Sequence, residues 1–102
     1  SMSTDAKKIL KDMLGELTFA DMLLSLRTTE EFTQQEVAEG INESKSRICD
    51  FEKGRRIPTL EQAGKLANFF GHPESFFYKR VFEDLARNAG INLVIQVKQL
   101  SA

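Results

Sequence analysis

The sequence has a single cysteine, a single histidine and no apolar run long enough to cross a membrane. One cysteine excludes an internal disulfide framework, which agrees with a reducing compartment. His72 has no cluster of further ligands around it in the sequence, so we expect no metal site and no cofactor. Because a secretory signal pattern is also missing, we expect a cytoplasmic protein that does not act at a membrane.

Patterns that carry catalysis are missing as well. There is no glycine-rich phosphate loop, and no pair of carboxylates stands out as a general acid and base. Cys49 and His72 could in principle serve as nucleophile and base, but no third group completes a motif around them. We therefore expect a protein that is not an enzyme.

The total charge argues against nucleic-acid binding, but the distribution of charge is uneven. The chain has 102 residues, which suits one domain, and a net charge of −1. Residues 44–56 carry five cations against two anions, whereas residues 27–43 carry five glutamates against Arg27 alone. A local positive patch of this kind favours weak non-specific DNA binding that a dimer would strengthen.

The most informative stretch is residues 32–58, which predict two short helices joined by a tight turn. Thr33 opens a capping box, and Asn42 tolerates the left-handed backbone that a sharp turn needs. Ser44 can cap the second helix and Gly54 can end it. The inward residues at helical spacing are Val37, Ala38, Ile41, Ile48 and Phe51. The stretch therefore predicts a helix-turn-helix.

The second helix of this motif has an outward face that suits DNA. An α-helix fits the major groove, where its polar side chains can reach base edges. The candidates for base reading are Lys45, Ser46, Cys49 and Asp50. The candidates for phosphate contact, mostly at the helix ends, are Thr33, Gln34, Ser44, Arg47, Lys53, Arg55 and Arg56. Lys45 can donate to guanine, and Asp50 can accept from cytosine N4.

At these residues the chain resembles the Xre/Cro/C1-type helix-turn-helix family. The matching pattern is Leu26-Arg27, Phe32-Thr33-Gln34, Glu36-Val37-Ala38, Ser44, Ser46, Ile48, Phe51-Glu52-Lys53-Gly54-Arg55 and Pro58. The resemblance covers residues 18–71. It implies an all-α, five- to six-helix, lambda-repressor-like domain that binds double-stranded DNA as a dimer. Three residues depart from the usual pattern: Glu31 and Asn42 replace glycines, and Glu43 replaces an apolar residue of the turn.

Further helices are expected on both sides of the motif. Apolar spacing predicts a short leading helix over residues 6–14, and Thr18 can cap a second one. Thr59 can cap a helix that ends at Gly71, and Pro73 can start a last helix over residues 73–90. These patterns divide the chain into a tail with a short helix (1–17), the DNA-binding domain with its last helix (18–90) and a C-terminal segment (91–102).

The last helix and the C-terminal segment have more apolar residues than one intramolecular contact needs. Residues 91–98 alternate apolar and polar side chains and are rich in β-branched residues, which predicts a short β-strand. No other stretch resembles a strand, so this one would take a partner from another molecule. The alternative is a loosely packed tail or a helical extension. The candidates for a dimer or partner contact are Phe77, Val81, Phe82, Leu93, Ile95 and Val97.

The leading helix, the motif, the last helix and the strand together resemble the antitoxin subset of the family, the HigA-like proteins. That resemblance implies repression of the protein's own operon and neutralisation of a RelE/HigB-like ribonuclease toxin. A homodimer would read an inverted-repeat operator. Two alternatives stay open: a stand-alone Xre-type regulator, and a protein-interaction module that keeps the fold without binding DNA. The acidic balance and Glu43 favour the latter.

Overall fold

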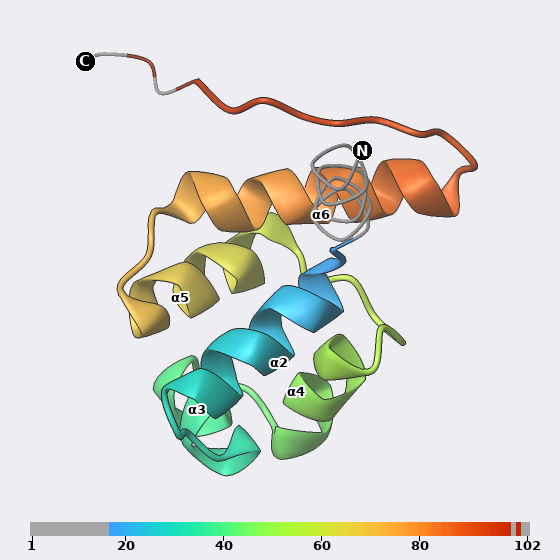
Figure 1. Ribbon diagram of the computed structural model, residues 1–102. Coiled ribbons are helices and arrows are strands. Elements are labelled where there is room, and N and C mark those ends of the chain that lie inside the picture. Colours follow the sequence, from blue (N-terminus) through green and yellow to red (C-terminus); the bar gives the residue numbers. More distant parts are fainter. Residues whose placement is uncertain (1–16, 99, 101–102) are drawn as a thin grey trace, which may run out of the picture.

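The computed structural model describes residues 17–98 and Leu100, and within that part the chain is all-α. Its helices are α2 (Phe19–Thr29), α3 (Gln34–Gly40), α4 (Lys45–Glu52), α5 (Leu60–Phe70) and α6 (Glu74–Asn88). α2 contacts both α4 and α6, and α5 packs along α6, so α2 lies between the motif and the last helix (Figure 1). None of the helices in the described part is long and apolar enough to cross a membrane.

Local hydrogen bonds set where the helices begin. Three of them start with a complete capping box, at Thr18, Thr33 and Thr59. The Thr33 hydroxyl, for example, accepts from the Glu36 N–H at 3.0 Å, while the Glu36 carboxylate accepts from the Thr33 N–H at 2.9 Å. Each box satisfies backbone donors that a helix start leaves open. The expected starts of these helices are therefore confirmed.

Residues with positive φ make the turns between the helices. A glycine with positive φ follows each of the last three helices: Gly54 after α4 (71°), Gly71 after α5 (71°) and Gly90 after α6 (78°). The predicted left-handed residue Asn42 has φ 58°, and Glu31 has φ 62° after α2. Glu31 therefore holds a conformation that costs a residue with a Cβ more than it costs glycine.

The core joins all five described helices around large apolar side chains. Its most completely buried members are Phe19, Leu23, Val37, Ile48, Phe51, Leu66 and Phe77. The Phe19 and Phe77 rings meet edge to face with their centroids 5.7 Å apart, which ties α2 to α6. Ala38 is fully buried, and its small side chain lets the two motif helices pack closely.

Burial corrects part of the expected partner surface. Phe77 and Val81 are only 1% and 2% exposed, so they belong to the core of the single chain. Sequence spacing could not separate them from Phe82, because α6 is apolar on two faces. Of the candidate contact residues, Phe82, Leu93 and Val97 are exposed and Ile95 is half-buried.

The predicted C-terminal strand is not present in the described residues. Residues 91–98 instead form an extended segment that turns back after α6 and runs alongside it (Figure 1). A β-strand needs a hydrogen-bonded neighbour, and the described part of the single chain offers none. A helical extension is excluded for the same residues, because they have no helical hydrogen bonds. The expected leading helix lies outside the described residues.

Candidate nucleic-acid interface

α4 presents one apolar face to the core and one polar face to the outside. Ile48 and Phe51 are buried, at 0% and 1% exposure. The opposite side carries Ser46, which is exposed, and Cys49 and Asp50, which are half-buried. Lys45 is exposed in the first turn of the helix. All four candidates for base reading are thus accessible on a single helix.

The start of α4 is fixed by Ser44, whose hydroxyl accepts from the Arg47 N–H at 3.1 Å. This bond uses one of the acceptor positions of Ser44, a candidate for phosphate contact. The Ser46 hydroxyl lies 3.4 Å from that of Ser44. The two serines can therefore act together, with one hydroxyl orienting the other.

Asp50 lies among the cations at the end of α4 rather than alone on its face. Its carboxylate is 3.5 Å from Arg55 Nη1 and 3.9 Å from Arg56 Nε, and the Asp50 carbonyl accepts from the Arg55 N–H at 2.9 Å. The two guanidinium groups remain more than half exposed. Asp50 therefore orients the two arginines that are candidates for phosphate contact, which sequence spacing alone did not indicate.

A buried carboxylate locks the motif to α2. The Glu52 side chain is 4% exposed, and its Oε1 accepts from Arg27 Nη2 and from Gln34 Nε2, each at 3.0 Å. Arg27 also donates to the Phe32 carbonyl at 2.9 Å. The hydrogen bond to Glu52 raises the pKa of Arg27, which keeps the guanidinium charged. Glu52 of α4 thus holds both Arg27 of α2 and Gln34 of α3.

Arg27 and Glu52 belong to the family pattern, but their spacing predicts no role for either, because a contact between positions 27 and 52 leaves no local signal. The contact changes the charge balance of the interface. Glu52 is neutralised inside the protein by Arg27, so it adds no exposed negative charge beside Arg47 and Lys53. The surface around α4 is therefore more positive than the sequence count suggests.

The start of α3 lies near the start of α4. A shallow hollow on the surface is lined by Thr33, Gln34 and Gln35 from one side and by Lys45 from the other. Gln34, a candidate for phosphate contact, already donates one amide hydrogen to Glu52 and keeps a second. The hollow brings the candidates at positions 33, 34 and 45 to one place.

The glutamates of the motif mostly serve its own structure. Glu36 caps α3, and Glu39 accepts from Gln35 at 3.0 Å. Glu43, in the turn, is half-buried and accepts from Gln62 of α5 at 2.9 Å. The carboxylate that departs from the family pattern is thus engaged with α5.

Comparison with known proteins agrees with this geometry. The model of the helix-turn-helix family matches residues 23–77. A curated relative, the transcriptional repressor RstR of the cryptic phage CTXphi from Vibrio cholerae, is 40% identical over 55 residues. The match covers 54% of this chain and 50% of the relative, so the chain matches about half of the relative's length. The comparison with solved structures gave no match.

Proposed function

The chain belongs to the Xre/Cro-type helix-turn-helix family, and from this premise we propose that it is a sequence-specific repressor of transcription. One observation carries the proposal: α4 offers an exposed polar face, flanked by cations, on a helix whose position Glu52 fixes. A rigid helix of this kind can enter the major groove without first being ordered. The matched relative is itself named a transcriptional repressor.

The roles of single residues follow from their places. Lys45 and Ser46, exposed at the start of α4, read bases together with Cys49 in the next turn. Asp50 either accepts from cytosine or holds Arg55 and Arg56, and its ion pairs favour the second role. Phosphates are contacted by Thr33, Gln34, Ser44, Arg47, Lys53, Arg55 and Arg56.

The protein acts as a homodimer on this proposal. A two-fold pair of chains presents two copies of α4 about 34 Å apart, one turn of DNA, so the operator is an inverted repeat. Dimerisation also compensates for the small number of exposed cations on each chain, since two weak half-site contacts combine.

A mobility-shift titration on the DNA upstream of the protein's own gene tests the repressor. We expect a shift that survives an excess of unrelated duplex and weakens steeply with added salt. A chain that shifts the upstream DNA and a scrambled duplex equally would not be a sequence-specific repressor. A chain that shifts neither would be the interaction module, which keeps the fold without binding DNA.

A second role, as the antitoxin of a RelE/HigB-like toxin, is favoured by the exposed acids on the α2–α3 side. Glu30, Glu31 and Glu39 are exposed there. A ribonuclease toxin must be basic to hold RNA, and an acidic surface attracts such a protein. Co-expression with the product of the adjacent gene tests this role. Failure to co-purify, with no relief of growth arrest, would leave a stand-alone regulator.

A further inference from the structure

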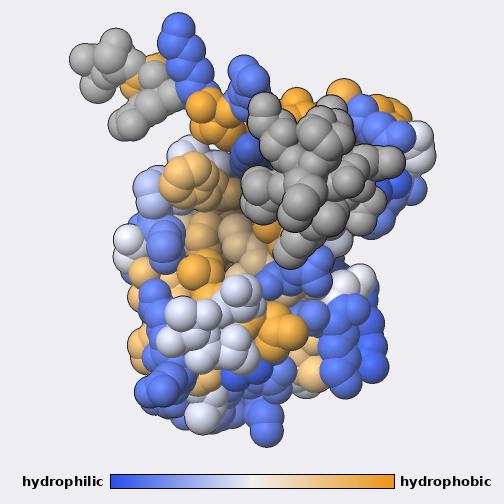
Figure 2. All heavy atoms as spheres, in the orientation of Figure 1, coloured by the Kyte–Doolittle hydropathy of each residue, from blue (hydrophilic) through white to orange (hydrophobic). Residues whose placement is uncertain are grey.

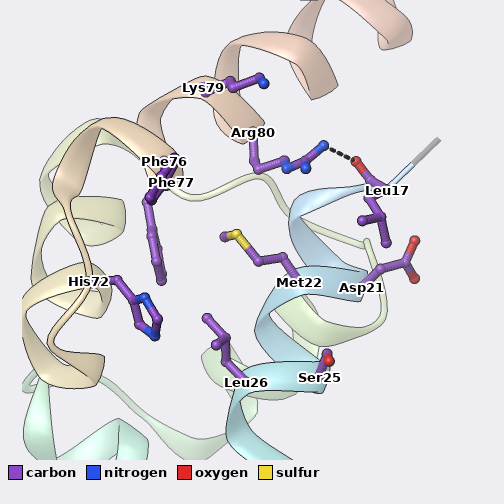
Figure 3. A pocket seen from close by; sticks show the side chains of 10 residues that line it. All are labelled: Leu17, Asp21, Met22, Ser25, Leu26, His72, Phe76, Phe77, Lys79 and Arg80. Carbon is purple, nitrogen blue, oxygen red and sulfur yellow. Dashed lines mark hydrogen bonds between the residues drawn. The ribbon is translucent and has the colours of Figure 1, made fainter. Parts of the chain in front are cut away.

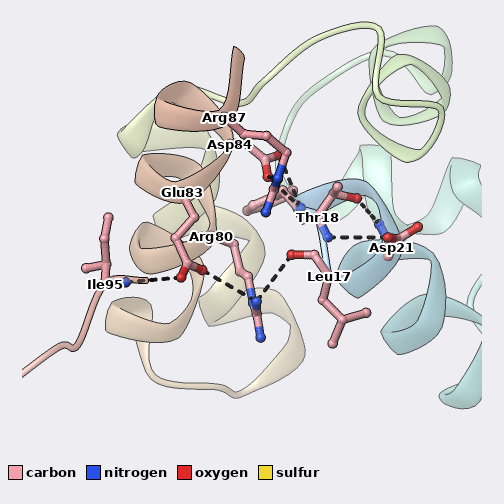
Figure 4. A network of polar contacts seen from close by, with 9 residues as sticks. Leu17, Thr18, Asp21, Arg80, Glu83, Asp84, Arg87 and Ile95 are labelled. Atoms are coloured by element: carbon pink, nitrogen blue, oxygen red, sulfur yellow. Dashed lines mark hydrogen bonds and ion pairs between the residues drawn. The ribbon is translucent and has the colours of Figure 1, made fainter. Parts of the chain in front are cut away.

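The extended segment after α6 is held to the helix by a buried carboxylate. The Ile95 N–H donates to Glu83 Oε2 at 3.1 Å, and Glu83 is only 6% exposed (Figure 4). The other oxygen of Glu83 accepts from Arg80, which also donates to the Leu17 carbonyl at 3.2 Å. Residues 91–98, the tail, are therefore anchored near their middle to a network that reaches Leu17, just before α2.

In the part of the chain that the structure describes, this anchor leaves one edge of the tail free. In an extended chain the N–H and C=O groups of alternate residues point to opposite edges. Because the Ile95 N–H points to α6, the backbone groups of residues 92, 94, 96 and 98 point away from it. No backbone hydrogen bond to these four residues is found in the described part of the chain. Within residues 17–98, the tail thus has an unpaired edge and lies alongside a helix.

The tail and α6 both carry exposed apolar side chains. Val94 is 77% exposed, and Leu93 and Val97 are about half exposed (52% and 44%). On α6, Phe82 and Leu85 are exposed to a similar degree (45% and 51%). Apolar residues of the tail are visible at the top of the molecule in Figure 2. Exposed apolar residues on a segment with an open edge, such as those of the tail, mark an interaction surface.

We infer that the occupant of this surface is a second copy of the chain, whose tail pairs antiparallel with the first about a two-fold axis. The inference rests on the proposed function, since it names the contact that makes the repressor a dimer. A two-fold axis brings the same edge of both chains together, so each free donor meets a free acceptor.

Charge favours a second copy over a basic protein at this edge. Residues 91–97 carry no charge, so two tails meet without repulsion, and a basic partner finds no acid there. The one cation of the tail, Lys98, then lies across from Asn92 of the other copy, close to the C-terminal end of α6. A helix C-terminus carries partial negative charge and attracts a cation.

The free edge also sets the register. Pairing centred on Ile95 places residue 94 opposite 96 and residue 92 opposite 98, and every such pair exchanges two N–H···O bonds. This register uses all four residues that point away from α6. A register shifted by one residue would place residues whose backbone groups point to α6 opposite residues whose backbone groups are free. Such pairs could not exchange their two bonds.

Proline at position 96 tests the pairing, because proline lacks the N–H yet fits an extended backbone. We expect Gln96→Pro in the full chain to raise the dimer dissociation constant about tenfold or more, measured by sedimentation equilibrium. Two bonds are lost across the axis, one in each chain. Gln96→Ala removes the same side chain and keeps the N–H, so its dissociation constant should stay within about twofold of wild type. Unchanged thermal unfolding at high protein concentration confirms that both variants fold.

A Gln96→Pro chain that dimerises as tightly as Gln96→Ala would overturn the inference, as would a wild-type chain that stays monomeric at micromolar concentration. Failure of the proposed function is a separate result, read on DNA. If the chain forms the tail-paired dimer but shifts no DNA, the inference holds and the repressor proposal fails. If the wild-type chain shifts its upstream DNA and the Gln96→Pro chain still dimerises, the repressor proposal is supported and the tail pairing is excluded.

Discussion

At the scale of single residues, the proposed function gives the first turn of α4 the main part in reading DNA. Lys45 and Ser46 are exposed there, and the capping bond at Ser44 fixes the backbone beneath them. A side chain on a fixed backbone loses less entropy when it binds a base. Specificity should therefore be concentrated at positions 45 and 46.

Lys45→Ala should weaken binding to the operator by about 1–3 kcal/mol and relax the preference at one base pair. The loss follows from the hydrogen bonds that a lysine donates to guanine. Fluorescence anisotropy on operator variants measures both effects. Lys65→Ala is the matched control, because Lys65 is an exposed lysine on α5 that pairs with Glu61. Equal losses for the two variants would show that Lys45 adds only charge.

Arg55→Ala should weaken binding to all sequences about equally and lower the slope of log affinity against log salt by roughly one. Arg55 is more than half exposed and is held by Asp50, as a phosphate contact requires. The salt dependence on operator and non-operator duplexes gives the measurement. A change in base preference at one position would instead identify Arg55 as a base reader.

At the scale of the helices, the Glu52 contact keeps α2, α3 and α4 in their relative positions. Arg27→Ala leaves the Glu52 carboxylate buried without its cation, so we expect a loss of roughly 3 kcal/mol in the free energy of unfolding. Lys65→Ala breaks an exposed ion pair and should cost less than about 1 kcal/mol. Urea unfolding of both variants compares them. Similar small losses would mean that packing alone holds the motif.

Gly40 is required where α3 passes α5. A Cβ at this position would lie 2.3 Å from Phe69 Cε2, in a ring that also packs against Phe32 and Phe70. Gly40→Ala should lower the free energy of unfolding by about 1–3 kcal/mol despite the better helix propensity of alanine. Thermal unfolding measures the loss. A stabilised variant would show that the Phe69 ring moves aside freely.

Sequence predicted the described helices well because their signals are local. A capping box spans four residues and a terminal glycine needs no distant partner, so α3, α4 and α5 were placed by residues next to them. The tail was predicted as a strand from its alternation alone, although a strand also needs a neighbour. Contacts such as Arg27 with Glu52 and Asp50 with Arg56 were missed because side chains meet there through the fold.

At the scale of the whole molecule, the proposed DNA-binding face on α4 is separate from the groove between α2 and α6 and from the exposed apolar residues of the tail. A groove between α2 and α6 of about 380 Å³ is lined by Met22, Leu26, Phe76 and Phe77 (Figure 3). It lies on elements other than α4, as does the tail beside α6. The protein can therefore bind a second chain through α6 and its tail while α4 stays open to DNA.

The most direct test of this account is a nuclease footprint of the full chain on the DNA upstream of its own gene. The account predicts two protected half-sites related by two-fold symmetry, with centres about 34 Å apart. Inserting about five base pairs between them, half a helical turn, should remove the strong protection, because one dimer could no longer place α4 in both grooves. Absence of protection, or protection that tolerates the insertion, would contradict a dimeric repressor that reads DNA through α4.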